Sequence, residues 1–144
     1  MRPTLLLIGV ALVATAVPAA AQVADTAPPA PRVIATIEVG QTRTGALDEG
    51  DYTMGDGTWA DVWYFHGTLG QRVVIELRVA ASNVFDPFLQ LLDPAGTKLA
   101  EDTDGAGNHN SRITFTLRET GRFQIVVNNE GDEQKTGRYT LSLR

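Results

Sequence analysis

The sequence contains no cysteine, and this absence removes several kinds of chemistry at once. A chain without thiols has no disulfide, no thiol nucleophile and no cysteine-ligated zinc or redox centre. Small exported proteins often depend on disulfides for stability. Here stability must come from a packed core, from backbone pairing and from any bound ion, and 144 residues are enough to bury such a core.

Basic residues are in the minority. Twelve Lys and Arg stand against 17 Asp and Glu, which gives a formal net charge of −5. Nucleic-acid binding needs a basic surface that displaces phosphate counterions, and the sequence shows no basic cluster. The same balance disfavours an anionic membrane surface. We therefore expect no nucleic-acid partner and no membrane attachment of the mature domain.

The first residues are typical of a secretory signal peptide. Arg2 precedes an apolar run over residues 5–17, Pro18 ends that run, and three alanines, Ala19 to Ala21, supply small residues for cleavage. A membrane anchor is the alternative, but the run is well short of the ~20 residues that a spanning helix needs. We predict that residues 1–21 are a signal peptide cleaved before Gln22.

The next segment, residues 22–32, reads QVADTAPPAPR and is typical of a flexible Pro/Ala-rich linker. Residues 33–144 then form one predicted domain. We expect this domain to be a monomer, exported to the periplasm or to the medium.

Alternating apolar and polar residues dominate this domain, and a period of two is typical of half-buried strands. Residues 72–79 show it most clearly, because Val73, Ile75 and Leu77 share one face while charged residues occupy the other. No segment has the spacing of an amphipathic helix. Since each strand has one apolar face, we predict an all-β, antiparallel β-sandwich of about eight strands. Its predicted core contains Trp63, Phe65, Ile75, Leu77, Leu89, Leu91, Phe115, Ile125 and Leu141.

Two matching segments lie near the C-terminus. Residues 120–123 read TGRF and residues 136–139 read TGRY, and each opens an alternating strand. Gly121 and Gly137 supply the turn in each copy, and an aromatic residue, Tyr139 in the second copy, anchors the strand. We interpret the two segments as the last two strands, lying side by side and antiparallel.

Several short motifs follow one another along the domain, each weak alone. In order they are Gly50-Asp51, Asp61 with Trp63 and Phe65, Gly70-Gln71, Phe85-Asp86-Pro87, Asp93-Pro94-Ala95-Gly96, an acidic loop at 101–110, and the two Thr-Gly-x-aromatic strands. The series, over about residues 39–144, resembles the bacterial pre-peptidase C-terminal domain family.

That resemblance implies a jelly-roll-like sandwich carried by secreted bacterial enzymes, often peptidases. Some members bind substrate polymers such as collagen, and some bind calcium. It thus implies a non-catalytic accessory module that engages a protein or polymer outside the cytoplasm, with a secreted peptidase or its substrate as candidate partners. Members usually follow a catalytic domain, and this chain shows none, so we expect a role in trans. The aromatic residues that contact collagen in relatives match no motif here.

The acidic loop at 101–110 is the predicted metal site. It reads EDTDGAGNHN, and calcium prefers six to eight hard oxygen ligands on a flexible loop. Asp102, Asp104 and Asn108 are the candidate calcium ligands. The loop is not an EF-hand, because Ala106 stands where that motif has an oxygen ligand. A solvated turn between two strands is the alternative.

Two other acidic residues have predicted structural roles. Asp61 lies two residues before Trp63 and therefore shares its inward face, where a carboxylate needs hydrogen bonds. We expect it to accept turn amides. Asp86, before Pro87, is expected to bond to its own backbone two residues further on.

Three aromatic residues are candidates for partner binding: Trp59, Tyr64 and Tyr52. Tyr64 faces away from Trp63 and Phe65, and exposed rings on a sheet often hold a polymer or peptide. For Trp59 the alternative is that it covers the edge of the core.

Catalysis finds little support. His66 and His109 are the only histidines, and Ser111 is too close to His109 in the chain to resemble a triad assembled from separate loops. We therefore predict a non-catalytic binding module with no catalytic residues. A calcium-stabilised structural module and a small hydrolase are the alternatives.

Overall fold

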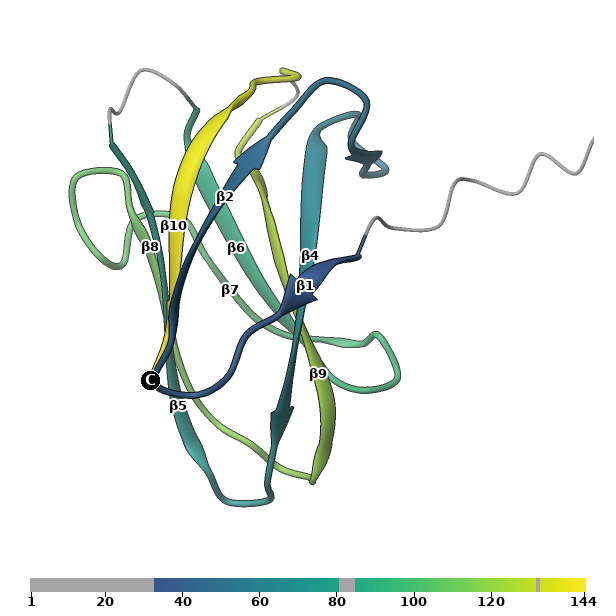
Figure 1. The fold of residues 1–144 in the computed structure, drawn as a ribbon, viewed down its shortest axis with the longest axis vertical. Coiled ribbons are helices and arrows are strands. Elements are labelled where there is room, and N and C mark those ends of the chain that lie inside the picture. The colour runs from purple at the N-terminus through teal and green to yellow at the C-terminus, as the bar shows by residue number, and fades with distance from the viewer. Residues whose placement is uncertain (1–32, 81–84, 132) are drawn as a thin grey trace, which may run out of the picture.

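The computed structural model describes residues 33–80, 85–131 and 133–144 (Figure 1). The predicted signal peptide and linker lie outside these residues. Within them no helix is long and apolar enough to cross a membrane. The regular elements are ten strands, which confirms the all-β prediction: β1 (Val33–Thr36), β2 (Thr42–Leu47), β3 (Tyr52–Thr53), β4 (Trp59–Gly67), β5 (Arg72–Val79), β6 (Pro87–Leu92), β7 (Lys98–Asp102), β8 (Ser111–Thr116), β9 (Gly121–Asn129) and β10 (Gly137–Leu143).

The strands form two sheets that face each other (Figure 1). A six-stranded sheet has the order β1-β4-β9-β6-β7, with β3 also paired to β4, and a four-stranded sheet has the order β2-β10-β5-β8. One pair departs from the antiparallel prediction, because β1 runs parallel to β4, with Ala35 opposite Trp63. Parallel neighbours need a long crossover. The chain provides it by crossing to the other sheet through β2 before it returns to β4.

The two matching Thr-Gly-Arg-aromatic strands are not neighbours, and the interpretation of them as an adjacent pair was wrong. β9 pairs with β4 and β6 in the six-stranded sheet, whereas β10 pairs with β2 and β5 in the other sheet. The chain crosses between the sheets after β9. Alternation fixes which face of a strand is buried but carries no information on the partner strand.

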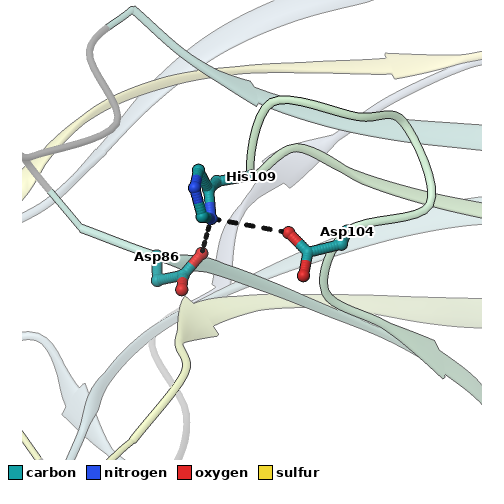
Figure 2. Close-up of side chains that lie close together, drawn as sticks. All are labelled: Asp86, Asp104 and His109. Atoms are coloured by element: carbon teal, nitrogen blue, oxygen red, sulfur yellow. Dashed lines mark ion pairs between the residues drawn. The ribbon is translucent and has the colours of Figure 1, made fainter.

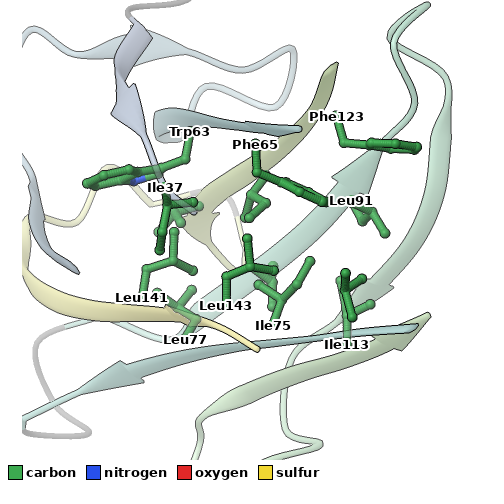
Figure 3. Close-up of a cluster of buried hydrophobic side chains, with 14 of the residues drawn as sticks. Ile37, Trp63, Phe65, Ile75, Leu77, Leu91, Ile113, Phe123, Leu141 and Leu143 are labelled. Atoms are coloured by element: carbon green, nitrogen blue, oxygen red, sulfur yellow. The ribbon is translucent and has the colours of Figure 1, made fainter. Parts of the chain in front are cut away.

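The predicted core fills the space between the sheets (Figure 3). Eight of the nine predicted core residues are buried, and Phe115 is partly buried against them. Phe65 and Phe123 stack there, with ring centroids 5.4 Å apart. Burying one such apolar side chain contributes about 1.5–3 kcal/mol, so this layer is the main source of stability in a protein without disulfides.

A second, smaller apolar cluster lies on the outer face of the six-stranded sheet. Ala60, Val62 and Val126 are buried there, because Tyr52, Met54, Tyr64 and Leu92 pack over them. The outward side of β4 is therefore partly covered by the rings of Tyr52 and Tyr64. Tyr64 also borders a candidate binding site.

Candidate functional site

An acidic and an aromatic residue of β4 form a buried hydrogen-bond relay with Tyr139 of β10. Asp61 lies inward, as predicted, and its Oδ2 accepts a hydrogen bond of 2.6 Å from the Tyr139 hydroxyl. The same hydroxyl accepts a hydrogen bond of 2.7 Å from Trp63 Nε1. Burial and the Asp61 carboxylate raise the pKa of Tyr139 well above its usual value. The relay ties the two sheets together across the core and is therefore structural.

Asp86 is positioned by its backbone at the start of β6. Its N–H donates to Asn129 Oδ1 at 2.9 Å, and its carbonyl accepts from the Glu130 N–H at 2.8 Å. Its carboxylate makes no hydrogen bond to its own backbone among the described residues, in contrast to the expected Asx turn. Oδ1 is buried and has no hydrogen-bond partner there. The side chain instead points toward the acidic loop (Figure 2).

Within that loop Asp102 and Asp104 have different surroundings. Asp102 Oδ2 accepts hydrogen bonds from the N–H groups of Gly105 at 2.7 Å and Arg112 at 2.8 Å. It therefore closes the loop in the manner of a capping residue. Asp104 is exposed and its carboxylate accepts no backbone hydrogen bond from the residues that the structure describes, and Asn108 is exposed as well. Of the three predicted calcium ligands, only Asp104 lies in the side-chain cluster described next.

The structure gathers Asp86, Asp104 and His109 into one cluster (Figure 2). His109 Nδ1 lies 3.6 Å from Asp104 Oδ1 and 3.9 Å from Asp86 Oδ1. The ligand atoms of all three side chains lie within 4.8 Å of one another. His109 and Asn108 both have positive φ angles, 58° and 55°, in a region that non-glycine residues seldom occupy. This turn aims the imidazole back over the two carboxylates.

One imidazole nitrogen and two carboxylate oxygens at these separations are chemically suited to a divalent cation. Sequence reasoning missed Asp86 and His109 as members of this set. The two lie in separate loops, and no local spacing relates them. Only the packing of β6 against β7 and β8 brings these loops together.

The three candidate aromatic residues do not share a surface. Trp59 is half-buried against the main core, as its alternative interpretation held. Tyr52 and Tyr64 pack on the outer face of the six-stranded sheet, over the smaller apolar cluster. The reason is strand parity, since Trp59 and Tyr64 are five residues apart on β4 and so point to opposite faces.

Tyr64 borders a pocket of about 390 Å³ beside β1 and β4. Ile37 and Phe65 give the pocket apolar lining, and the remaining lining residues are mostly polar or charged: Thr36, Glu38, Val39, Tyr64, His66, Gln71 and Arg122. The Ile37 N–H donates to the Tyr64 carbonyl at 2.8 Å and so holds the segment that follows β1 against β4. Val39 is exposed at the rim.

Arg122 is the distinctive group of this pocket. Its guanidinium lies over the Tyr64 ring, 3.6 Å from the ring centroid, and His66 stands opposite it across the β4–β9 pair. Among the described residues no carboxylate pairs with Arg122. A cation stacked in this way is held in place while its N–H groups stay available, so the pocket can bind an anionic group.

The residues considered for hydrolysis do not form a catalytic arrangement. Ser111 is buried, and its hydroxyl donates to the Pro87 carbonyl at 2.7 Å. His109 faces Asp86 and Asp104, and His66 lines the pocket on the six-stranded sheet. The serine hydroxyl is thus occupied in joining β8 to β6.

The bacterial pre-peptidase C-terminal domain family matches residues 60–129, the span from β4 to the end of β9. This part of the chain therefore has the sequence pattern of that family. No curated protein sequence matches the chain. Among solved structures, the pre-peptidase C-terminal domain of a Bacillus anthracis collagenase is similar, with a TM-score of 0.59 and 18% identity, over 80% of this chain and 99% of the other.

Two further solved structures share this fold. One is PliG of Aeromonas hydrophila, a periplasmic inhibitor of g-type lysozyme, with a TM-score of 0.51 and 15% identity over 80% of this chain and 100% of that one. The other is CorA, a surface-associated copper-binding protein of Methylomicrobium album BG8, with a TM-score of 0.52 and 12% identity over 80% and 99% of the chains. The family and the fold are those of an accessory or binding module.

Proposed function

We propose that this domain is an exported, non-catalytic module that binds a protein or polymer partner through the pocket beside β1 and β4. The observation that carries the proposal is Arg122, stacked on Tyr64 and without a carboxylate partner among the described residues. A periplasmic protein and a surface-associated protein among the structural neighbours support a place outside the cytoplasm. A secreted peptidase or its substrate is the partner class that the family supports.

The pocket suits one side chain or chain end of such a partner. Its volume of about 390 Å³ lies within the range of small-ligand sites, and its apolar lining from Ile37 and Phe65 can bury carbon atoms. The planar guanidinium of Arg122 can take a carboxylate through two parallel N–H···O bonds. We therefore expect the bound group to be a carboxylate, from a C-terminus or an acidic side chain of the partner.

A peptide titration followed by NMR tests this proposal. The ¹⁵N-labelled domain is titrated with a pool of short acetylated peptides, once with free C-terminal carboxylates and once with C-terminal amides. The carboxylate pool should shift the amide signals of Tyr64, His66 and Arg122 more strongly than the amide pool. Arg122→Gln should abolish the difference, and Arg118→Gln is the control, because Arg118 also lies over a ring, that of Phe115, but outside the pocket. Equal shifts from both pools would refute the proposed carboxylate site.

Export is part of the proposal and has its own test. Intact mass and N-terminal sequencing of the protein produced in a bacterial host should find a chain that begins at Gln22. An uncleaved chain in the membrane fraction would contradict the proposal.

A second function is supported by the cluster of Asp86, Asp104 and His109. We propose that the acidic loop binds a divalent cation that stabilises the domain, with Asp104 as a ligand. Calcium with Asp102 and Asn108 is the choice predicted from the sequence. The imidazole of His109 favours a softer ion such as zinc or copper.

Thermal unfolding distinguishes these ligand sets. A cation that binds only the folded domain stabilises it by about 2.7 kcal/mol at a hundredfold excess over its Kd. Calcium and zinc are each compared with chelator in the wild type, Asn108→Gly and His109→Asn. If calcium raises the melting temperature of every protein except Asn108→Gly, the ligand set predicted from the sequence is supported. If zinc raises the melting temperature of every protein except His109→Asn, the cluster of Asp86, Asp104 and His109 is supported. Unchanged melting of the wild type with both ions would exclude the proposed site.

A further inference from the structure

The outer face of the four-stranded sheet collects arginines that are isolated in the sequence. It carries five arginines and one glutamate on the adjacent strands β10, β5 and β8 and the residue that follows β10: Arg72, Arg78, Arg112, Arg138, Arg144 and Glu76. All five arginines are exposed, and each has a direct chain neighbour that is buried in the core: Val73, Leu77, Ile113, Tyr139 and Leu143. We call this surface the arginine face. It is basic on a protein whose net charge is −5.

Glu76 holds three of these arginines in a fixed array. Its side chain is only 5% exposed, and its oxygens lie 3.1 Å from Arg78 Nη2, 2.8 Å from Arg112 Nη2 and 3.6 Å from Arg144 Nη1. Burial raises the pKa of Glu76, but the hydrogen bonds from Arg78 and Arg112 outweigh it and bring the pKa below its usual value. One carboxylate therefore stands against three guanidinium groups, and most of their N–H donors remain unused.

The other two arginines have no acidic partner among the described residues. Arg72 lies opposite Thr116 on β8, and Arg138 lies opposite Ala46 on β2. Neighbouring strands are about 4.8 Å apart, and β10, β5 and β8 are direct neighbours, so their outward arginines lie on one continuous surface. A hollow of about 120 Å³ lies between Arg78 and Arg138, with Thr44 and Thr140 on its walls.

We infer that the arginine face binds an acidic polysaccharide. Charge complementarity carries this inference, because guanidinium groups pair with carboxylate or sulfate groups repeated along a chain. Threonine hydroxyl groups fill the rows between the arginines and can bond to sugar hydroxyls: Thr42, Thr44, Thr114, Thr116 and Thr140. None of the outward residues of the four described strands is aromatic, and single-stranded nucleic acid relies on aromatic stacking.

This surface shares no residue with the pocket of the proposed function, which is lined mainly by residues of the other sheet and of the segment that follows β1. The two sites can therefore be tested with different arginines. Arg72→Gln with Arg138→Gln removes charge from the arginine face and leaves the three arginines around Glu76 in place. Lys98→Gln with Arg118→Gln removes the same charge from outside both the arginine face and the pocket and serves as the matched control, because Lys98 lies on β7 of the other sheet and Arg118 lies over the Phe115 ring.

Calorimetry at low and high salt measures how the full mature domain binds three polymers: polygalacturonate, neutral dextran and single-stranded poly(dT). We expect binding to polygalacturonate that weakens as salt rises, and none to dextran. The Arg72/Arg138 variant should bind about tenfold more weakly or worse, while the Lys98/Arg118 variant should bind like the wild type. Both variants should keep the wild-type melting temperature.

Three results would overturn the inference. These are no binding of the wild type to polygalacturonate at low salt, an equal loss in the two double variants, and tighter binding to poly(dT) than to polygalacturonate. The last result would assign the face to nucleic acid.

Discussion

Replacing Tyr139 with phenylalanine removes a single oxygen atom from the middle of the buried relay. That oxygen donates to Asp61 Oδ2 at 2.6 Å and accepts from Trp63 Nε1 at 2.7 Å, so the substitution breaks two hydrogen bonds and leaves the ring in place. A hydrogen bond to a charged group contributes about 1.5–3 kcal/mol, and a buried donor left without a partner costs about 1–3 kcal/mol. We expect a loss of about 3 kcal/mol, a large part of the 5–15 kcal/mol typical of a folded domain.

Urea unfolding of the wild type, Tyr139→Phe and Tyr64→Phe provides the measurement. Tyr64→Phe makes the same chemical change at a half-buried ring whose hydroxyl has no hydrogen-bond partner among the described residues, so it should alter stability by only about 0.5 kcal/mol. A loss below about 1 kcal/mol for Tyr139→Phe, or equal losses for both variants, would show that the relay contributes little and would refute the reasoning.

Three other substitutions test the packing and the charge network. Leu77→Ala should cost about 2–5 kcal/mol in urea unfolding, because Leu77 is fully buried between the sheets, and a cost below about 1 kcal/mol would contradict that placement. Gly45→Ala should cost about 1–3 kcal/mol, since the added Cβ would overlap the Tyr139 ring, and an unchanged urea midpoint would contradict that contact. Glu76 has a lowered pKa in the folded state, so its contribution is present above its ordinary pKa of 4.5 and is lost as pH falls through the folded value. Glu76→Gln should therefore be less stable at neutral pH and lose less stability on acidification, and an equal acid loss in both proteins would refute this role.

The cluster of Asp86, Asp104 and His109 shows how much of a candidate site a sequence can reveal. Asp104 could be chosen from composition alone, because an acidic, glycine-rich loop is the usual setting of calcium ligands. Composition could not identify the neighbours of Asp104 in the structure, Asp86 and His109. Each lies in a loop whose position depends on strand pairing elsewhere. Asp102, chosen on the same composition, instead bonds to the backbone amides of its own loop and of β8.

The sequence by itself determined which residues are buried. The period of two in β5 and β6 identifies an apolar face without reference to any partner, since each strand must hide that face wherever it lies. The order of motifs also indicated the family whose model matches residues 60–129, because the turn residues and the inward residues of β4 occur at fixed positions along the chain.

Only the tertiary structure decided which strands are neighbours. Strand pairing in turn decided which residues share each surface that is proposed as a site. Backbone hydrogen bonds between strands are the same for all sequences, so two similar strands such as β9 and β10 can lie in different sheets. The arginine face follows from the same fact. Arg72, Arg112 and Arg138 are far apart in the sequence, and they form one basic surface only because β5 pairs with both β8 and β10.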